Sequence, residues 1–130
     1  MKRLDFNLTD IFYIGLGGML GSLLRWLAGT GFEGVIPVPT ILVNVLGAAA
    51  LGILYASQHQ LHLRGKYLYM VGFCGSFTTV SLFSHETIQL LMADEWGLAA
   101  INILLPVILS LAAVAAIVPA IEKAVERRHS

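Results

Sequence analysis

A cluster of small and hydroxyl-bearing residues lies in the middle of an otherwise apolar segment, GFCGSFTTVSLF at positions 72–83. Gly72 and Gly75 are poor helix formers, and the hydroxyls of Thr78 and Thr79 compete for backbone hydrogen bonds. Non-helical backbone at membrane depth is tolerated where it is buried in protein or lines a cavity, and interrupted helices often hold ions there. The stretch therefore predicts either an ion-holding break in a helix or an unbroken helix with a packing seam of small residues.

Two further polar side chains fall inside apolar segments. Asn44 lies in TILVNVLGAAALG, where its amide either bonds to a neighbouring helix or lines a polar path as a donor. Arg25 lies in GLGGMLGSLLRW, about one turn from the end of its segment. A guanidinium there must snorkel to the interface, pair, or face water at the mouth of a pore.

The same first segment carries small residues at helical spacing. Gly17 and Gly21 are four residues apart, as are Gly18 and Ser22, so each pair shares one face of a helix. Small residues at this spacing let two helices approach closely in lipid. We interpret this face as a tight packing surface.

Catalytic chemistry finds little support in the sequence. Ser81, His85 and Glu86 resemble a hydrolase set by residue type, but neighbouring positions on one helix seldom give triad geometry. Cys74 is the single cysteine, so no intrachain disulfide can form, and we interpret it as a packing residue. The protein is not expected to be an enzyme.

The segments that carry these residues are long enough to cross a membrane. The chain has 130 residues, of which 57% are hydrophobic and 12% charged, and a bilayer core needs about 20 apolar helical residues. Four segments qualify, approximately 11–29, 40–57, 67–92 and 97–121. The predicted fold is one all-α membrane domain of four transmembrane helices, with Pro106 bending the last and Ser110 one turn later.

The distribution of basic residues predicts the orientation. The chain has eight basic and eight acidic residues, which gives no reason to expect a nucleic acid as partner. With four spans, one face carries both termini and the second connection, and its basic residues are Lys2, Arg3, Arg64, Lys66, Lys123, Arg127 and Arg128. Arg25 alone lies toward the opposite face, which also carries Glu33, Asp94 and Glu95. The positive-inside rule then predicts a multi-pass protein of the plasma or inner membrane with cytoplasmic termini.

Three motifs together resemble the CrcB/Fluc family of fluoride channels. They are GGMLGSLLRW at 17–26, NVLGAAALG at 44–52 and GFCGSFTTVSLFSHE at 72–86, so the resemblance runs through the chain. It implies an antiparallel dimer of four-helix subunits with two fluoride pores. It also implies a structural sodium ion at the dimer centre, held where the third helix is broken near its middle.

The resemblance also assigns roles to single residues. The backbone carbonyls of Gly75 and Thr78 would be the sodium ligands, two from each subunit, and oxygen ligands suit such a hard cation. Phe83 would line the fluoride path with its ring edge, which is the positive part of an aromatic ring. The remaining path residues would contribute amide, hydroxyl or guanidinium donors: Asn44, Thr79, Ser81, Arg25 and Ser110.

Two positions depart from the family pattern. Val80 stands where the family usually has a first phenylalanine, and Leu82 where it usually has threonine. One aromatic edge and one hydroxyl are therefore missing. The basic bias also fixes one orientation, whereas subunits that insert both ways carry little bias.

These observations leave three functions to compare. The first is a channel that lets cytoplasmic fluoride leave by passive diffusion and so reduces its toxicity. The second is a weakly conducting or non-conducting subunit that pairs with an oppositely inserted paralogue. The third, a small four-span drug/proton antiporter, needs an intramembrane carboxylate, for which Glu86 is the only candidate.

Overall fold

Four long helical segments make up nearly all of the described chain. The computed structural model describes residues 7–30 and 37–129, of which the side chains of 128 and 129 are not included. The first two segments are α1 (Leu8–Gly29) and α2 (Val38–Ala56), the third spans Leu63–Met92, and the fourth is α6 (Trp96–His129). Each is long and apolar enough to cross a membrane. Across the described ranges the structure has no strand, and the prediction of four transmembrane helices is confirmed.

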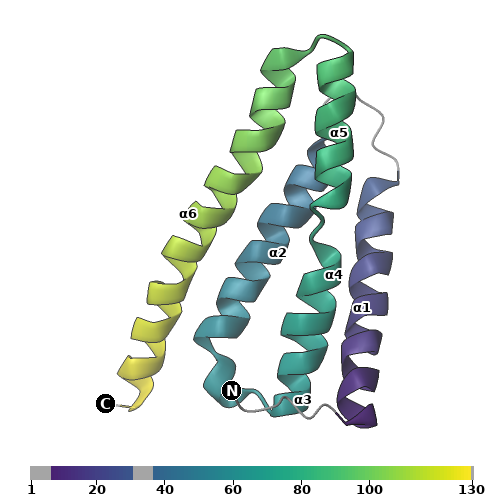
Figure 1. The fold of residues 1–130 in the computed structure, drawn as a ribbon. Coiled ribbons are helices and arrows are strands. Elements are labelled where there is room, and N and C mark those ends of the chain that lie inside the picture. The colour runs from purple at the N-terminus through teal and green to yellow at the C-terminus, as the bar shows by residue number, and fades with distance from the viewer. Residues whose placement is uncertain (1–6, 31–36, 130) are drawn as a thin grey trace, which may run out of the picture.

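The third segment is built from several short elements. A 3-10 turn, η1 (Gln58–Gln60), leads into α3 (Leu63–Gly65), the π-helical η2 (Lys66–Cys74) and α4 (Gly75–Phe77). Thr78 then has extended backbone, with φ −75° and ψ 155°. α5 (Ser81–Met92) completes the segment, so that Thr78, Thr79 and Val80 form the link between α4 and α5, which appears as a thin strand of backbone in Figure 1.

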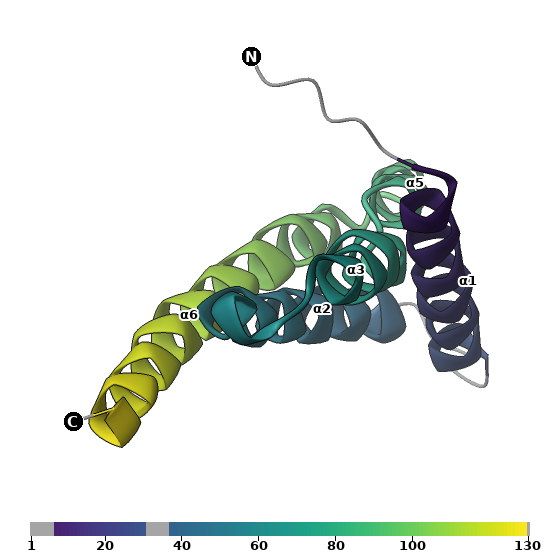
Figure 2. The same ribbon diagram turned by 90° about the horizontal axis from the view of Figure 1, so that it is seen from below.

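The four segments lie side by side in the order α1, third segment, α2, α6. Figures 1 and 2 agree that α1 and α6 lie on opposite sides, with α2 and the third segment between them. α1 packs on η2 and α4, while α6 packs on α2 and, at its N-terminal end, on α5. The third segment is therefore packed against α1 through η2 and α4, and against α6 through α5.

Most charged residues of the described chain lie toward the two ends of this arrangement, and Glu86, within α5, is an exception. The start of α1, α3 and the end of α6 lie at one end in Figure 1, which carries Arg64, Lys66, Lys123 and Arg127. Arg25 lies in the last two turns of α1, toward the other end, where Asp94 and Glu95 connect α5 to α6. The predicted orientation also depends on Lys2, Arg3, Glu33 and Arg128. The first three lie outside the described residues, as does the side chain of Arg128.

Glycines allow α1 to touch the backbone of the third segment. A Cβ added at Gly17 would overlap the carbonyl oxygen of Leu68, and one at Gly21 would overlap that of Phe73. From the other side, a Cβ at Gly72 would overlap the carbonyl oxygen of Ile14. The prediction of a tight packing surface at Gly17 and Gly21 is confirmed, because no other residue fits at this separation.

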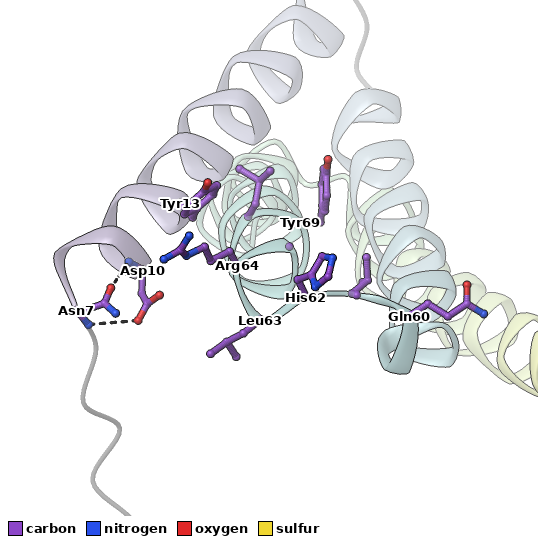
Figure 3. Close-up of a pocket in the computed structure, with 11 residues that line it drawn as sticks. Asn7, Asp10, Tyr13, Gln60, His62, Leu63, Arg64 and Tyr69 are labelled. Atoms are coloured by element: carbon purple, nitrogen blue, oxygen red, sulfur yellow. Dashed lines mark hydrogen bonds between the residues drawn. The ribbon is translucent and has the colours of Figure 1, made fainter.

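Side-chain contacts fix the first turn of α1. Asn7 and Asp10 form a capping box, in which Asn7 Oδ1 accepts from the Asp10 N–H at 2.9 Å and Asp10 Oδ2 accepts from the Asn7 N–H at 3.2 Å. Figure 3 shows both bonds beside a hollow of about 730 Å³. The guanidinium carbon of Arg64 lies 5.9 Å from the centroid of the Tyr13 ring, a cation–π contact that ties α3 to α1.

Most apolar side chains of this chain face outward. The buried apolar residues of the described part are Ile41, Val43, Ala56, Cys74, Phe77, Leu90 and Ala99. By contrast, large side chains such as Leu51, Val107 and Leu111 are 41%, 52% and 67% exposed. A surface of this kind requires lipid or a partner protein around it.

Candidate functional site

Asn44 binds the link between α4 and α5 through a pair of hydrogen bonds. The Thr79 N–H donates to Asn44 Oδ1 at 2.8 Å, and Asn44 Nδ2 donates to the Thr79 carbonyl at 3.1 Å. One side chain thus satisfies two polar backbone groups that no regular helix pairs. The sequence left two roles open for Asn44, and the structure shows that its amide bonds to the neighbouring third segment.

The irregular backbone of the link leaves several carbonyls of the third segment without their helical donors, among them those of Gly75 and Thr78. In a continuous helix the carbonyl of Gly75 would accept from the N–H of Thr79, and that of Thr78 from the N–H of Leu82. Instead the Thr79 N–H donates to Asn44, and the Leu82 N–H donates to Thr79 Oγ1 at 3.2 Å. Within the described residues, the carbonyls of Gly75 and Thr78 therefore lack these donors, as do those of Ser76 and Phe77, because no hydrogen bond runs to them from the N–H groups of Val80 and Ser81.

Thr79 connects the link to the first turn of α5. Its hydroxyl oxygen accepts from the Leu82 N–H and also lies 3.3 Å from Ser81 Oγ. Either oxygen can donate in the second contact. Thr79 is 5% exposed. The hydroxyl thus satisfies one free N–H of the first turn of α5, whose N-cap residue, Val80, makes no side-chain hydrogen bond.

An open hollow of about 360 Å³ lies beside the Asn44–Thr79 pair, and we call it the central hollow. It is bordered by α2, the link, α5 and α6. Its lining residues are Asn44, Thr78, Thr79, Val80, Phe83, Pro106, Val107, Ser110 and Leu111. No charged side chain is among them, and most of its wall is apolar with a few polar groups at fixed positions, as is usual for a small-ligand site.

The central hollow brings together residues from three separate parts of the sequence that were expected on one path. Asn44, Thr79, Phe83 and Ser110 all line it. Arg25 and Ser81 do not: Arg25 is half-buried on α1, and Ser81 is exposed and reaches the site only through its contact with Thr79.

The two residues expected to hold sodium are placed differently. Thr78 is half-buried and lines the central hollow. Gly75 is exposed, and a Cβ built on it would meet nothing within 4 Å. The backbone of Gly75 therefore faces space that the described part of this chain does not fill.

The polar groups of the central hollow can donate hydrogen bonds to a small anion. Asn44 Nδ2 donates one N–H to the Thr79 carbonyl, and its other N–H has no acceptor within the described part of the chain. Ser110 adds a hydroxyl, and Phe83 adds an aromatic ring whose edge is electropositive. The arrangement offers donors without a formal charge, which suits passage of an anion better than tight retention of it.

A second polar contact, which the sequence reasoning missed, lies between α2 and α5. Thr40 Oγ1 donates to Glu86 Oε1 at 2.6 Å, and Thr40 is 1% exposed. Glu86 Oε2 is buried without a partner in the described residues. The four-residue spacing of Thr40 and Asn44, which places both on one face of α2, is the signal that could have found Thr40.

Comparisons with known proteins agree on one family. The family described as "CrcB-like protein, Camphor Resistance (CrcB)" matches residues 12–118. A protein of a Nitratiruptor species named "Fluoride-specific ion channel FluC" is 38% identical over 110 residues, covering 81% of this chain and 86% of the relative. Proteins of the same name from Campylobacter lari and Shewanella denitrificans are 38% and 39% identical, covering 80% and 77% of this chain and 90% and 86% of theirs.

Proposed function

The chain belongs to the CrcB-like family, and from this premise we propose that it is a fluoride-selective channel through which cytoplasmic fluoride leaves the cell by passive diffusion. The family consists of ion channels and not of enzymes. The observation that carries the proposal is the central hollow, because it gathers Asn44, Thr79, Phe83 and Ser110 around one uncharged, donor-bearing space. In it, amide and hydroxyl donors replace part of the water shell of fluoride.

Export of this kind protects a cell from fluoride that enters as its neutral acid. A passive path suffices because the acid ionises in the cytoplasm and the anion then leaves down its own gradient. To test this, a bacterial strain that lacks fluoride export is supplied with the chain and its internal fluoride is measured. We expect internal fluoride to fall severalfold relative to the strain with an empty vector, and equal levels in both strains would contradict the proposal.

We further propose that two copies assemble in opposite orientations around a structural sodium ion. The carbonyls of Gly75 and Thr78 from each copy would hold the ion, since buried oxygen ligands suit a hard cation. Two observations fit this role: both carbonyls have lost their helical donors, and Gly75 faces space that a second copy could occupy.

Sodium dependence gives a direct check on this assembly. A ligand that binds only the folded dimer stabilises it in proportion to the logarithm of its concentration. We expect the unfolding temperature of the purified protein to rise with sodium and to respond much less to potassium or N-methylglucamine at equal ionic strength. Equal responses to the three cations would remove sodium from the proposal.

A second candidate function is that of a subunit in a heteromeric channel. Val80 is 76% exposed and Leu82 is 42% exposed, and neither supplies the aromatic ring or hydroxyl that the family pattern has there. A partner of opposite orientation would supply them. Cross-linking of the chain expressed alone decides between the two assemblies: a stable, conducting antiparallel homodimer would exclude the heteromer.

In this heteromeric assembly the chain has one orientation, and we propose that both of its termini lie in the cytoplasm and that the protein lies in the plasma or inner membrane. Arg64, Lys66, Lys123 and Arg127 support this orientation, because they lie at the end that carries the start of α1 and the end of α6. An alkaline phosphatase fused to the C-terminus should then be inactive, whereas an active fusion would contradict the single orientation.

A further inference from the structure

A buried amide on α6 holds the backbone of α5 just outside the central hollow. Asn102 Nδ2 donates to Thr87 Oγ1 at 2.9 Å and approaches the Phe83 carbonyl at 3.4 Å. Thr87 Oγ1 in turn donates to the same carbonyl at 2.8 Å. The three residues form a chain of hydrogen bonds that begins on α6 and ends on the carbonyl of Phe83, and we call it the Asn102 chain.

The groups of the Asn102 chain are removed from solvent. Asn102 is 1% exposed and Thr87 is 8% exposed. Because the Phe83 carbonyl can only accept, the side of the amide that faces it must be the NH₂ group. Asn102 Oδ1 is left buried and without a partner in the described residues, and an orphaned polar atom of this kind weakens stability. A residue kept solely to pack α6 on α5 would more simply be apolar.

The Asn102 chain lies between α5 and α6, close to the central hollow. On α6 the buried residues Ala99, Asn102 and Pro106 follow one another at helical spacing, and Pro106 lines the central hollow. Phe83, which lines the hollow from α5, lies one turn before Thr87. The polar layer therefore lies directly next to the point where α5 and α6 separate to form the walls of the hollow.

We propose that Asn102 is a positioning residue, which through Thr87 fixes the register of α5 against α6 and so fixes the ring of Phe83 at the wall of the central hollow. The part of this inference that concerns transport rests on the proposed fluoride path. The part that concerns the ring does not. A hydrogen-bonded polar layer sets a unique register where apolar side chains alone allow several.

The ring of Phe83 can be observed directly. We choose 4-fluorophenylalanine at position 83 and ¹⁹F NMR of the full chain in lipid nanodiscs, comparing the unmodified sequence with Asn102→Leu, which conserves the approximate volume but cannot donate. We expect one narrow resonance for the unmodified sequence and a shifted or split resonance for Asn102→Leu. Ile103 is an exposed neighbour of Asn102 on the same helix. The control variant is Ile103→Val, which should leave the resonance unchanged.

Thr87 supplies a second pair of variants in case Asn102→Leu fails to fold. Thr87→Val removes the hydroxyl and keeps the shape, whereas Thr87→Ser keeps the hydroxyl. The proposal expects Thr87→Val to change the resonance of residue 83 and Thr87→Ser to restore it. The same resonance in Thr87→Val as in the unmodified sequence would overturn the proposal.

Transport provides a second readout. In vesicles, Asn102→Leu and Thr87→Val should each lower the ratio of fluoride to chloride efflux by about tenfold, the factor that corresponds to a difference of about 1.4 kcal/mol between two barriers. Because both variants break the same Asn102 chain, the double variant should lower this efflux ratio no further than either variant alone. Additive losses would overturn the proposal. If the unmodified chain carries no fluoride at all, the proposed function fails, while the NMR result still decides the role of Asn102.

Discussion

Replacement of Asn44 by aspartate is expected to lower the rate of fluoride efflux by about a thousandfold. The amide donates to the Thr79 carbonyl at 3.1 Å and its second N–H is directed to no other acceptor in the described chain. In Asn44→Asp a carboxylate replaces both donors at the wall of the central hollow. An anion passing about 4 Å from that charge meets a barrier of about 4 kcal/mol at an effective dielectric constant of about 20, which corresponds to about a thousandfold in rate. Fluoride efflux from reconstituted vesicles measures the effect.

The matched control for this change is Asn44→Ala, which removes both hydrogen bonds to Thr79 without adding a charge. We expect a smaller loss of transport, of about ten- to a hundredfold, because a buried polar group left unpaired costs about 1–3 kcal/mol. The difference in efflux between the two variants isolates the effect of the added negative charge. Undiminished fluoride efflux in Asn44→Asp would take Asn44 off the path of the ion.

Gly17→Ala is expected to destabilise the protein more than any other single methyl group added to α1. The new Cβ would overlap the backbone carbonyl of Leu68, an atom that no side-chain rotation can move away. α1 and η2 must then separate along their shared face, and forced overpacking costs typically about 1–3 kcal/mol and more where backbone must shift. We expect a loss of about 3 kcal/mol, measured as a fall in the unfolding temperature in detergent and in the yield of monodisperse protein.

Gly15→Ala is the control for Gly17→Ala, because it lies on the same helix and its added Cβ would meet nothing within 4 Å. Alanine is also the better helix former, by about 1 kcal/mol. The control should therefore be as stable as the parent chain or slightly more so. Equal losses in both variants would show that the contact of Gly17 with Leu68 does not hold the two helices together.

Part of this architecture could be predicted from the sequence because it depends on local composition. Four apolar stretches of sufficient length indicate four membrane helices, and the four-residue spacing of Gly17 and Gly21 indicates a close contact. The low helix propensity of the residues around Gly75 and Thr78 indicates where regular helix is weakest. Each of these signals lies within one segment, so no knowledge of the partner segment is needed.

The pairing of these segments could not be predicted in the same way. Asn44 and Thr79 are 35 positions apart, and their two hydrogen bonds depend on the register of α2 against the third segment. The same holds for Thr40 with Glu86 and for Asn102 with Thr87. A lone polar residue in an apolar helix predicts that a partner exists. Which partner it finds depends on packing.

Fluoride and chloride efflux from lipid vesicles that contain only this chain tests the central claim most directly. The claim is that the donors around the central hollow let a small, strongly hydrated anion pass while the larger halide is rejected. Ion-selective electrodes follow both ions after a potassium ionophore is added. The ionophore lets potassium leave with the anion, so that no membrane potential opposes the efflux. The account predicts rapid loss of fluoride and retention of chloride. Equal release of the two ions, or no release of fluoride from vesicles shown to hold folded protein, would contradict it.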